Sequence, residues 1–597
     1  MCSYSVNFII ALVFAVLLPA ICRNPLKKRF FGAICSPIIL YVLFYNYDYG
    51  LMGGPFPFLI SYMGTALAVC TSLLAVSFRR EQTYLEEASH PIMKFIVSEV
   101  FVSLSLFIVF ASPWAIDTFP LSNVEAVLFT VFAGANEGAE EFVISSLVDK
   151  VVSPTLWTIL ILLIIQGSFS FALFKSGRIY SAKLWNFKLN LGHRSFLQVL
   201  WQLQKTSLIF LSVYAAILLF ILPGIASSTP FKALFQRPVD SELYREHYVH
   251  PDSVKIEMQG EAMNLIVIFL ESMEKNFVRH TPEIASQERD ALDFLPGGQN
   301  TSGTSWTIAA ITGKLCGIPL NMPMGINEYQ GKLPTYLPYA KCLMNILAER
   351  EYNQLCMQGS NGEFTQLNDF FRAHGNVSVH DLEYYKTVGK IPKNYKVFWG
   401  FEDRKLYRFA KDEIDSIANL DKPFAVYLST IDTHQPNGYL DDSCRIALKE
   451  MGFAEIENNM YPAVLRCASI QLNSFLNWMR EQPWFDKTVV FVMGDHVNRN
   501  LSPKAGVPQF DSLYWTSFVL NSAVENYRQE RAYSSLDMFP TILESMGFEL
   551  NDHAIGLGKS LYANNPTLVE IYGRKVLDSL LRERSIQYDE LLMGKKK

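Results

Sequence analysis

Long apolar runs crowd into the first 225 residues of the chain and then stop. Each run is long enough for a helix to cross the hydrocarbon core of a bilayer, which takes about 20 residues. The pattern therefore predicts a polytopic α-helical membrane domain over residues 1–225. Its expected spans are Val6–Cys22, Gly32–Met52, Phe56–Phe78, Met93–Ile116, Leu156–Lys175 and Ser207–Ile225.

Lys and Arg residues fall in alternate loops between these spans. They follow the first span, follow the third, and fill the loop before the sixth, whereas residues 46–55 and 117–123 contain neither. Basic loops stay on the cytoplasmic side of a membrane. The pattern therefore predicts that the N-terminus and the polar part of the chain lie outside the cytoplasm.

The segment Val124–Val151 does not fit this scheme, because it is only moderately apolar and carries Glu125, Glu137, Glu140 and Glu141. We interpret it as an interfacial or re-entrant element on the outer face. Acids buried in a membrane are commonly functional, and solvent-exposed helix acids are the alternative interpretation.

The pattern changes after the last span. Residues 226–260 are rich in charge and lack long apolar runs, which indicates a linker. From residue 261 to residue 597, apolar strands alternate with amphipathic helices, as is typical of an α/β sheet. The clearest strands are nearly continuous apolar runs, as expected of strands buried on both faces. They are Asn264–Leu270, Gln354–Met357, Phe424–Leu428 and Thr488–Met493.

Three of these strands end in residues that can bind a metal ion or a phosphate. Glu271 follows the first strand, Asp432-Thr433-His434 follows the third, and Asp495-His496 follows the fourth. Ligands collect at the carboxyl ends of parallel strands, and carboxylate and imidazole ligands suit zinc or manganese. One such residue alone is more often structural, but three strand ends together predict a metal-centred site.

The run Gly303-Thr304-Ser305-Trp306-Thr307 leads into an apolar stretch that predicts a helix. The first turn of a helix offers free N–H groups and a positive dipole end, which together favour a bound phosphate. Thr304 or Ser305 as an ordinary helix cap is the alternative interpretation.

Composition narrows the class of protein. A chain of 597 residues is expected to form two or more units, and a net charge of −5 gives no support for a nucleic-acid partner. Five of the nine cysteines lie in the polar part, and they are Cys316, Cys342, Cys356, Cys444 and Cys467. In an oxidising compartment, Cys316–Cys342 and Cys444–Cys467 are candidate disulfides, with buried reduced thiols as the alternative.

Five motifs resemble the alkaline phosphatase/sulfatase superfamily, and within it the membrane-bound lipoteichoic acid synthases and phosphoglycerol transferases. They are NLIVIFLES at 264–272, GTSWTIAAITGKLCGIPL at 303–320, TIDTHQPNGY at 430–439, VMGDH at 492–496 and LDMFPTILESMG at 536–547. The resemblance implies an alkaline-phosphatase-like α/β/α sandwich over residues 261–597, on the extracytoplasmic side of a bacterial inner membrane.

The resemblance also implies roles for particular residues. Glu271, Asp495 and His496 would bind one divalent cation, Mn²⁺ or Zn²⁺. Thr304 would be the nucleophile and the fourth ligand, because the T-x-x-S/T pattern of the group favours Thr304 over Thr307. His434 resembles a residue that contacts the phosphate or the acceptor.

The implied reaction is transfer of phosphoglycerol from a membrane phospholipid, phosphatidylglycerol, through a phospho-threonine to an envelope glycan or lipopolysaccharide. The run CGIPL at 316–320 resembles the phosphoglycerol transferases that decorate periplasmic glucans. Lipoteichoic acid synthases carry a phosphate-binding Trp and Arg at the positions of Thr365 and Leu367. We therefore expect substrate contacts from Asn361, Trp399 and Lys405 instead.

Three other functions remain open. A phosphoethanolamine transferase acting on lipid A or a glycan would share the site plan, although its usual Ser-Val-Pro-Cys after the threonine is absent. A sulfatase or phosphodiesterase would hydrolyse its substrate, although the sulfatase pattern C/S-x-P-x-R is absent around Thr304. A non-catalytic lipid-binding sensor or transporter would not need the full set of metal ligands.

Overall fold

The computed structural model describes most of the second half of the chain and parts of the first. The described residues are 79–80, 91–118, 148–176, 180–184, 187–191, 196, 239–291, 293–321, 337–362, 367–395, 397–434, 438–453, 460–498, 514–524 and 530–593. The chain divides into two compact units, one built mainly from the first 229 residues and one mainly from Pro230–Lys597.

In the first unit, the helices α4 (Pro91–Thr118) and α7 (Ser153–Ser176) coincide with two of the expected spans. The other four expected spans, and most of the segment 124–151, lie outside the described residues. Within the described part of the chain, no helix combines the length and the apolar content needed to cross a membrane. The polytopic membrane domain therefore stays a prediction.

A seven-stranded sheet organises the second unit, with strand order β6-β12-β11-β5-β10-β8-β9. The central strands run parallel and include all four predicted strands, within a residue or two. They are β5 (Asn264–Leu270), β8 (Asn353–Gln358), β9 (Ser378–His380), β10 (Phe424–Ser429) and β11 (Thr488–Gly494). The edge strands β12 (Ser517–Leu520) and β6 (Asp293–Phe294) are antiparallel, and the sequence pattern did not single them out.

Strand β5 shows why these strands read as continuous apolar runs. Leu265, Val267 and Phe269 point into one hydrophobic core, and Ile266 and Ile268 into a second core on the opposite face. Since both faces are covered, both sets of alternating positions must be apolar. Burial of each such side chain contributes about 2 kcal/mol to stability.

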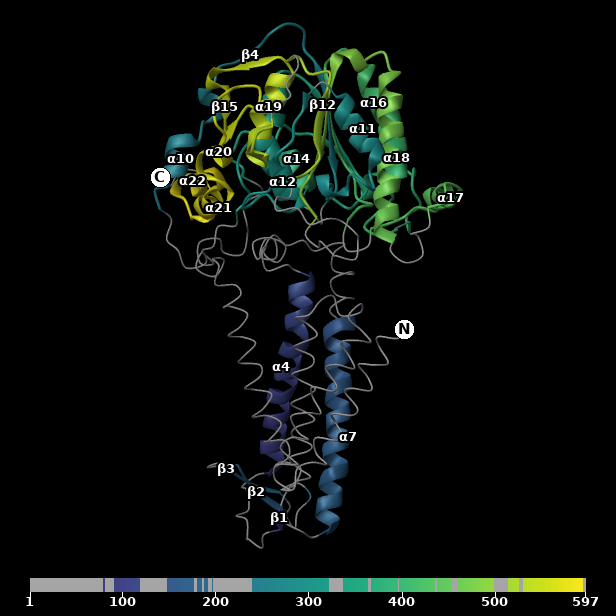
Figure 1. Cartoon of the computed structure of the whole chain (residues 1–597), viewed down its shortest axis with the longest axis vertical. Helices are drawn as coiled ribbons and strands as arrows, with labels where there is room; N and C mark the ends of the chain where they lie inside the picture. The colour runs from purple at the N-terminus through teal and green to yellow at the C-terminus, as the bar shows by residue number, and fades with distance from the viewer. Residues whose placement is uncertain are drawn as a thin grey trace. The chain divides into compact units, whose positions relative to one another are not determined.

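Helices cover both faces of the sheet, as Figure 1 shows for the second unit. One face carries α12 (Thr307–Cys316), α13 (Leu343–Glu349), α14 (Leu367–Ala373) and α19 (Met538–Ser545), whose side chains join the first core. The other carries α11 (Pro282–Asp290), α15 (Leu382–Thr387), α16 (Asp403–Ala418) and α18 (Met460–Arg480), which join the second. This arrangement confirms the predicted α/β sandwich.

The sequence of α16 shows why these helices lie on the sheet. Leu406, Phe409, Ala410 and Ile414 recur at helical spacing and are buried, while the charged positions between them face outward. Such a stripe is the usual signature of a helix packed on one side.

Part of the segment expected to be a linker, 226–260, packs into the second unit. It forms α10 (Glu242–His247) and β4 (Ile256–Met258), and β4 pairs antiparallel with β14 (Phe548–Leu550). The C-terminal residues form α20 (Leu568–Tyr572), α21 (Arg574–Arg582) and α22 (Ile586–Met593).

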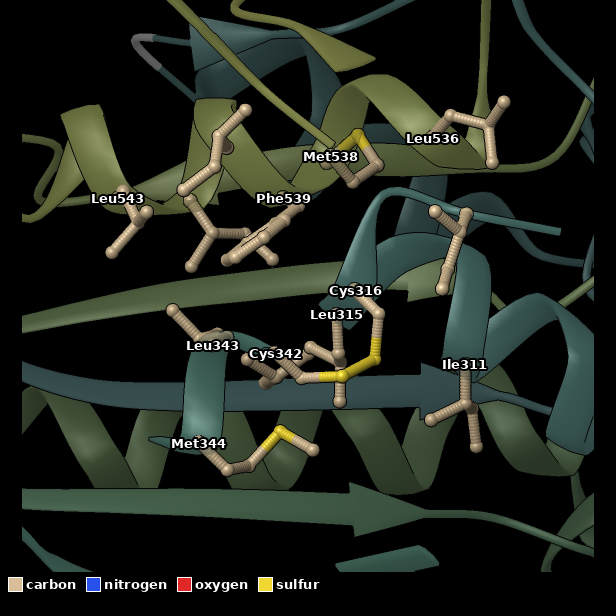
Figure 2. Close-up of a cluster of buried hydrophobic side chains, with 14 of the residues drawn as sticks. Ile311, Leu315, Cys316, Cys342, Leu343, Met344, Leu536, Met538, Phe539 and Leu543 are labelled. Carbon is tan, nitrogen blue, oxygen red and sulfur yellow. A yellow bond between two sulfur atoms is a disulfide. The ribbon is translucent and has the colours of Figure 1, made fainter. Parts of the chain in front are cut away.

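The structure joins Cys316 to Cys342 and Cys444 to Cys467 by disulfide bonds. These are the two pairings suggested by the sequence. The Cys316–Cys342 bond ties the last residue of α12 to the start of α13 within the first core, beside Leu315, Leu343 and Phe539 (Figure 2). The Cys444–Cys467 bond lies in a smaller apolar cluster between α17 (Asp442–Glu450) and α18.

Removing the two disulfides in turn should destabilise the second unit unequally. The loops closed by Cys316–Cys342 and Cys444–Cys467 span 26 and 23 positions, so each bond constrains the unfolded chain by a similar amount, about 3 kcal/mol. Cys316 and Cys342 are 2% and 0% exposed, and Cys444 and Cys467 are 8% and 3% exposed. The pair Cys316→Ala/Cys342→Ala therefore leaves the more deeply buried cavity, which adds the larger cavity cost. Scanning calorimetry should therefore show the larger fall in unfolding temperature for that pair than for Cys444→Ala/Cys467→Ala. A larger fall for the second pair would contradict this account.

Candidate active site

The carboxyl ends of β5 and β11 place two carboxylates and an imidazole side by side. β11 pairs with β5 in parallel, with Gly494 opposite Leu270, so the residues that follow each strand meet at the same rim. There, Glu271, Asp495 and His496 each offer a ligand atom, and these atoms all lie within 4.8 Å of one another. The structure thus brings together the three residues expected to bind a cation.

The orientation of His496 favours metal binding. Its Nδ1 lies 2.9 Å from the carbonyl oxygen of Val497 and donates a hydrogen bond to it, which leaves a lone pair on Nε2. Nε2 lies 3.8 Å from Oε1 of Glu271 and 3.5 Å from Oδ2 of Asp495. The Nε2 edge of the ring therefore faces the two carboxylates, and in the neutral tautomer it offers a lone pair to an ion.

The burial of the two carboxylates also fits a bound cation. Glu271 is 2% exposed and Asp495 is 1% exposed. Oδ1 of Asp495 accepts hydrogen bonds from the backbone N–H groups of Ser272 and His496, but Oδ2 has no hydrogen-bond partner among the described residues. A buried carboxylate oxygen without a partner costs several kcal/mol. A divalent ion that accepts oxygen and nitrogen ligands, such as Zn²⁺ or Mn²⁺, removes that cost.

Backbone contacts from the end of β10 hold Glu271 in place. The N–H of Glu271 donates to Oγ1 of Thr430 at 3.0 Å, and its carbonyl accepts from Oγ1 of Thr433 at 2.6 Å. Because β10 lies on the other side of β5, the third predicted strand end joins the same rim. His434 follows directly.

The hydroxyl beside this cluster belongs to Thr307, the first residue of α12. Its Oγ1 lies 3.3 Å from Oε2 of Glu271. Thr304 points elsewhere: its Oγ1 donates to the carbonyl of Thr301 and accepts from the N–H of Thr301, both at 2.9 Å, and the residue is fully buried. The structure therefore places Thr307, and not Thr304, next to the candidate metal ligands.

The local sequence explains this geometry. Gly303 adopts φ +73°, and a Cβ there would lie 2.5 Å from Oδ1 of Asn321. The loop can therefore pack tightly on residues 319–321, while Thr304 closes a short turn with Thr301. The helix begins only after Trp306, whose extended backbone forms the N-cap. Thr307 thus stands at the helix N-terminus, where N–H groups are unused.

A small pocket opens next to Glu271 and Thr307. Its other lining residues are Gln358, Ser360, Leu367, Trp399, Ser429, Thr430, Ile431 and His434. Two predicted contact residues, Trp399 and His434, thus line the same space, with their ring centroids 4.8 Å apart. Asn361 is not among the lining residues, and Lys405 forms an ion pair with Glu402 instead.

The turn that presents Trp399 is strained. Val397 and Gly400 exchange two backbone hydrogen bonds, and Phe398 between them has φ +51°. A non-glycine residue in that region costs about 1–3 kcal/mol, and such strain is common at functional sites.

A reciprocal pair of acids fixes this turn relative to His434. Asp403 accepts hydrogen bonds from the N–H groups of Ile431 and Asp432, and Asp432 accepts one from the N–H of Asp403. Burial raises the pKa of Asp403 to about 7, and burial together with the Asp403 charge raises the pKa of Asp432. The start of α16 and the end of β10 are therefore held as one piece.

Lys314 is a further residue of the site that the sequence analysis did not identify. It is fully buried on α12, and its Nζ donates to the carbonyl oxygen of Asp495 at 2.7 Å and to Ser535 Oγ at 3.2 Å. Its ammonium also lies 4.3 Å from the ring centroid of Trp515, and burial lowers its pKa to about 7. In the sequence, the feature that could have identified Lys314 is a single charged residue within an otherwise apolar helix. Lys314 connects the helix of Thr307 to the backbone of Asp495.

Comparison with known proteins identifies the class of this unit. Residues 263–548 match the family model described as Sulfatase, and this range contains the sheet, the cluster and Thr307. This match supports a sulfatase-like domain of the alkaline phosphatase/sulfatase superfamily over residues 263–548.

Particular relatives are phosphoglycerol transferases. Phosphoglycerol transferase I of Escherichia coli (strain 55989 / EAEC) is 27% identical over 304 residues, and phosphoglycerol transferase I of Citrobacter koseri is 28% identical over 304 residues. Each match covers 50% of this chain and 39% of the relative. The match therefore spans well under half of the length of these relatives.

Solved structures show more distant similarity. Lipoteichoic acid synthase LtaP from Listeria monocytogenes is 16% identical, with a TM-score of 0.42, over 51% of this chain and 79% of that one. A protein in the alkaline phosphatase superfamily from Vibrio parahaemolyticus is 18% identical, with a TM-score of 0.41, over 57% of this chain and 78% of that one. The family assignment rests on the sequence matches.

Replacing Glu271 by Ala should abolish stoichiometric binding of Zn²⁺ or Mn²⁺, because it removes one of three ligands from a buried site. Inductively coupled plasma mass spectrometry of the purified full chain measures the metal content. Glu274→Gln is a matched control: Glu274 lies on the same rim and is buried, but it is not part of the cluster. Its Oε2 accepts from the N–H of Asn498, and a glutamine oxygen can keep that bond. Loss of metal from the control, with retention by Glu271→Ala, would overturn the assignment.

Proposed function

We propose that this protein is a divalent-metal-dependent transferase that moves phosphoglycerol from a membrane phospholipid to an envelope glycan. The observation that carries the proposal is the position of Thr307. Its hydroxyl stands at a helix N-terminus, beside Glu271 and the cluster with Asp495 and His496, and it lines a pocket. The similarity to phosphoglycerol transferase I supports the same reaction class.

Thr307 is the nucleophile in this proposal, and it replaces Thr304 in that role. The Thr304 hydroxyl donates and accepts hydrogen bonds within its own turn and is fully buried. The Thr307 hydroxyl lines the pocket and contacts a candidate metal ligand. The T-x-x-S/T pattern favours Thr304 as its leading residue, whereas the contacts of the two hydroxyl groups favour Thr307.

The reaction proceeds in two displacements at phosphorus. Thr307 Oγ1 forms a bond to the phosphorus of the donor, the bond to the diacylglycerol oxygen breaks, and the threonine proton passes to that oxygen. An acceptor hydroxyl then forms a bond to phosphorus, the bond to Thr307 Oγ1 breaks, and the proton of the acceptor passes to Thr307 Oγ1. His434 lines the pocket and can carry these protons. The free N–H groups of α12 stabilise negative charge on the phosphoryl oxygens.

The residues Glu271, Asp495 and His496 would hold the ion. When bound, a divalent cation lowers the pKa of a nearby hydroxyl and neutralises charge on phosphoryl oxygens.

The pocket chemistry favours glycerol over ethanolamine as the transferred alcohol. Among the described residues that line the pocket, only Glu271 and His434 are ionisable, and Glu271 is assigned to the ion. Gln358, Ser360 and Ser429 are neutral hydrogen-bonding residues that suit hydroxyl groups. To bind an ammonium group, the pocket would need a second carboxylate among its lining residues. Phosphoethanolamine transfer is therefore the second candidate.

The cellular location follows from the sequence pattern and the disulfides. Two disulfides within the second unit suit an oxidising compartment. Together with the predicted membrane spans, they support a catalytic unit on the periplasmic side of a bacterial inner membrane, where the donor lipid is accessible.

The nucleophile assignment predicts opposite behaviour of the two threonines. Thr307→Ala should abolish head-group transfer and give no covalent adduct when the protein is incubated with phosphatidylglycerol vesicles. Thr304→Ala should still form the adduct on Thr307, at a rate reduced because the turn with Thr301 is weakened. Peptide mass spectrometry locates the adduct. An adduct on Thr304 that persists in Thr307→Ala would overturn the assignment.

The donor assignment predicts selectivity between two lipids. With phosphatidylglycerol and phosphatidylethanolamine vesicles supplied separately, we expect transfer from the first at least about 100-fold faster, because an ammonium group without a counter-charge is costly to bury. Release of labelled diacylglycerol measures both rates. Equal rates, or a preference for phosphatidylethanolamine, would favour the second candidate.

A further inference from the structure

The C-terminal helices α21 and α22 lie beyond the residues that match the sulfatase family model, which end at 548. They nevertheless pack into the first core of the catalytic unit through Leu577, Leu581 and Tyr588, which are at most 4% exposed. They contribute no candidate metal ligand to the active site.

One contact reaches the loop that leads to Thr307. Oδ1 of Asp578, on α21, accepts a hydrogen bond of 2.7 Å from the backbone N–H of Ser302. Burial raises the pKa of Asp578. A buried carboxylate that binds a loop N–H fixes the position of the loop, because loss of the bond leaves a polar group unsatisfied.

A second set of contacts reaches the residues after α12. The hydroxyl of Tyr588 accepts from the N–H of Asn321 at 2.8 Å and donates to the carbonyl oxygen of Pro319 at 2.9 Å. Nδ2 of Asn321 donates to the carbonyl oxygen of Leu581 at 2.6 Å. α21 and α22 thus bind the chain on both sides of the helix that begins with Thr307.

These two sides of α12 also contact each other. The N–H of Leu320 donates to the carbonyl oxygen of Gly303 at 2.9 Å. A Cβ at Gly303 would lie 2.7 Å from Cβ of Pro319. The loop 302–304 therefore contacts residues 319–321 directly, and the C-terminal helices bind both of these segments.

The same helices hold the segment by which the chain enters the catalytic unit. The N–H of Val239 donates to the carbonyl oxygen of Arg584, and its carbonyl accepts from the N–H of Ile586, both at 2.9 Å. The ring of Tyr244 lies 6.0 Å from the ring of Tyr588. Tyr588 therefore contacts both the entering segment and the residues after α12.

We propose that α21 and α22 form a clamp that positions Thr307, with Asp578 and Tyr588 as its positioning residues. The clamp acts through the backbone of Ser302 and Asn321 and touches no substrate. It keeps the Thr307 hydroxyl in line with the phosphorus, and a shift of about 1 Å in such a group can reduce the rate about 100-fold. This role rests on the proposed function of Thr307.

The test compares variants of the full-length protein. Asp578→Ala removes the acceptor for the Ser302 N–H, and Tyr588→Phe removes the hydroxyl that binds Asn321. We expect each to lower kcat for head-group transfer about 10- to 100-fold, with KM for phosphatidylglycerol within about twofold of wild type, since the lipid contacts are unchanged. Asp578→Asn keeps an acceptor oxygen and should restore most of kcat. Ser579→Ala, on the exposed side of α21, is the matched control and should leave kcat unchanged.

Hydrogen–deuterium exchange provides a readout that needs no substrate. In Asp578→Ala, amides of residues 300–306 should exchange faster, while those of β5 keep the wild-type rate. This result would support the clamp even if phosphoglycerol is not the transferred group. Two results would overturn the proposal: unchanged exchange at 300–306 with unchanged kcat, or faster exchange throughout the sheet, which would indicate general destabilisation. Failure of Asp578→Asn to restore either readout would also count against it.

Discussion

Two carboxylates lie buried side by side in the catalytic unit, and the arrangement of the elements around them depends on this pair. Glu271 and Asp495 are almost completely removed from water, and Oδ2 of Asp495 has no hydrogen-bond partner among the described residues. Such an arrangement is costly unless a cation is bound. The parallel register of β5 and β11 forces the two groups together, and both strands are buried in the central sheet. The sheet therefore supplies the rigidity that holds two like charges close to each other.

The surrounding elements each hold one part of this rim. The end of β10 binds the backbone of Glu271 through Thr430 and Thr433. Lys314 joins α12 to the carbonyl oxygen of Asp495. Because Lys314 bonds to the carbonyl and not to the carboxylate, the carboxylate remains available for an ion. Fixed dipoles and charges around a site need no reorganisation during reaction, which is the main source of electrostatic catalysis.

The strands and the clustering of Glu271, Asp495 and His496 could be predicted from the sequence because their signals are local. Apolar runs such as 264–270 end in acids, and parallel strands bring their ends together. The sequence could not show in this way that Thr307, and not Thr304, contacts Glu271. Both lie in the same short run, and the outcome depends on where Trp306 lets the helix begin and on the turn that Thr304 forms with Thr301.

Long-range contacts explain the other differences between expectation and structure. The antiparallel edge strands β12 and β6 are short, and their pairing depends on distant partners. Asn361 follows a strand that lines the pocket, yet Gln358 and Ser360 are the residues that reach it. Asp578 lies 276 positions from its partner Ser302. The hydrophobic periodicity of a sequence does not indicate contacts over such a separation. Four of the expected membrane spans lie outside the described residues, and no described helix is long and apolar enough to cross a membrane, so all six spans remain predictions.

The contact between Asp578 and Ser302 has an evolutionary consequence. The carboxylate binds a backbone N–H, which every amino acid except proline provides. This hydrogen bond therefore does not itself constrain the side chain at position 302, whereas it requires an acceptor at position 578. Selection on the catalytic loop would then be visible far from the loop, in a helix that lies outside the family-matched residues.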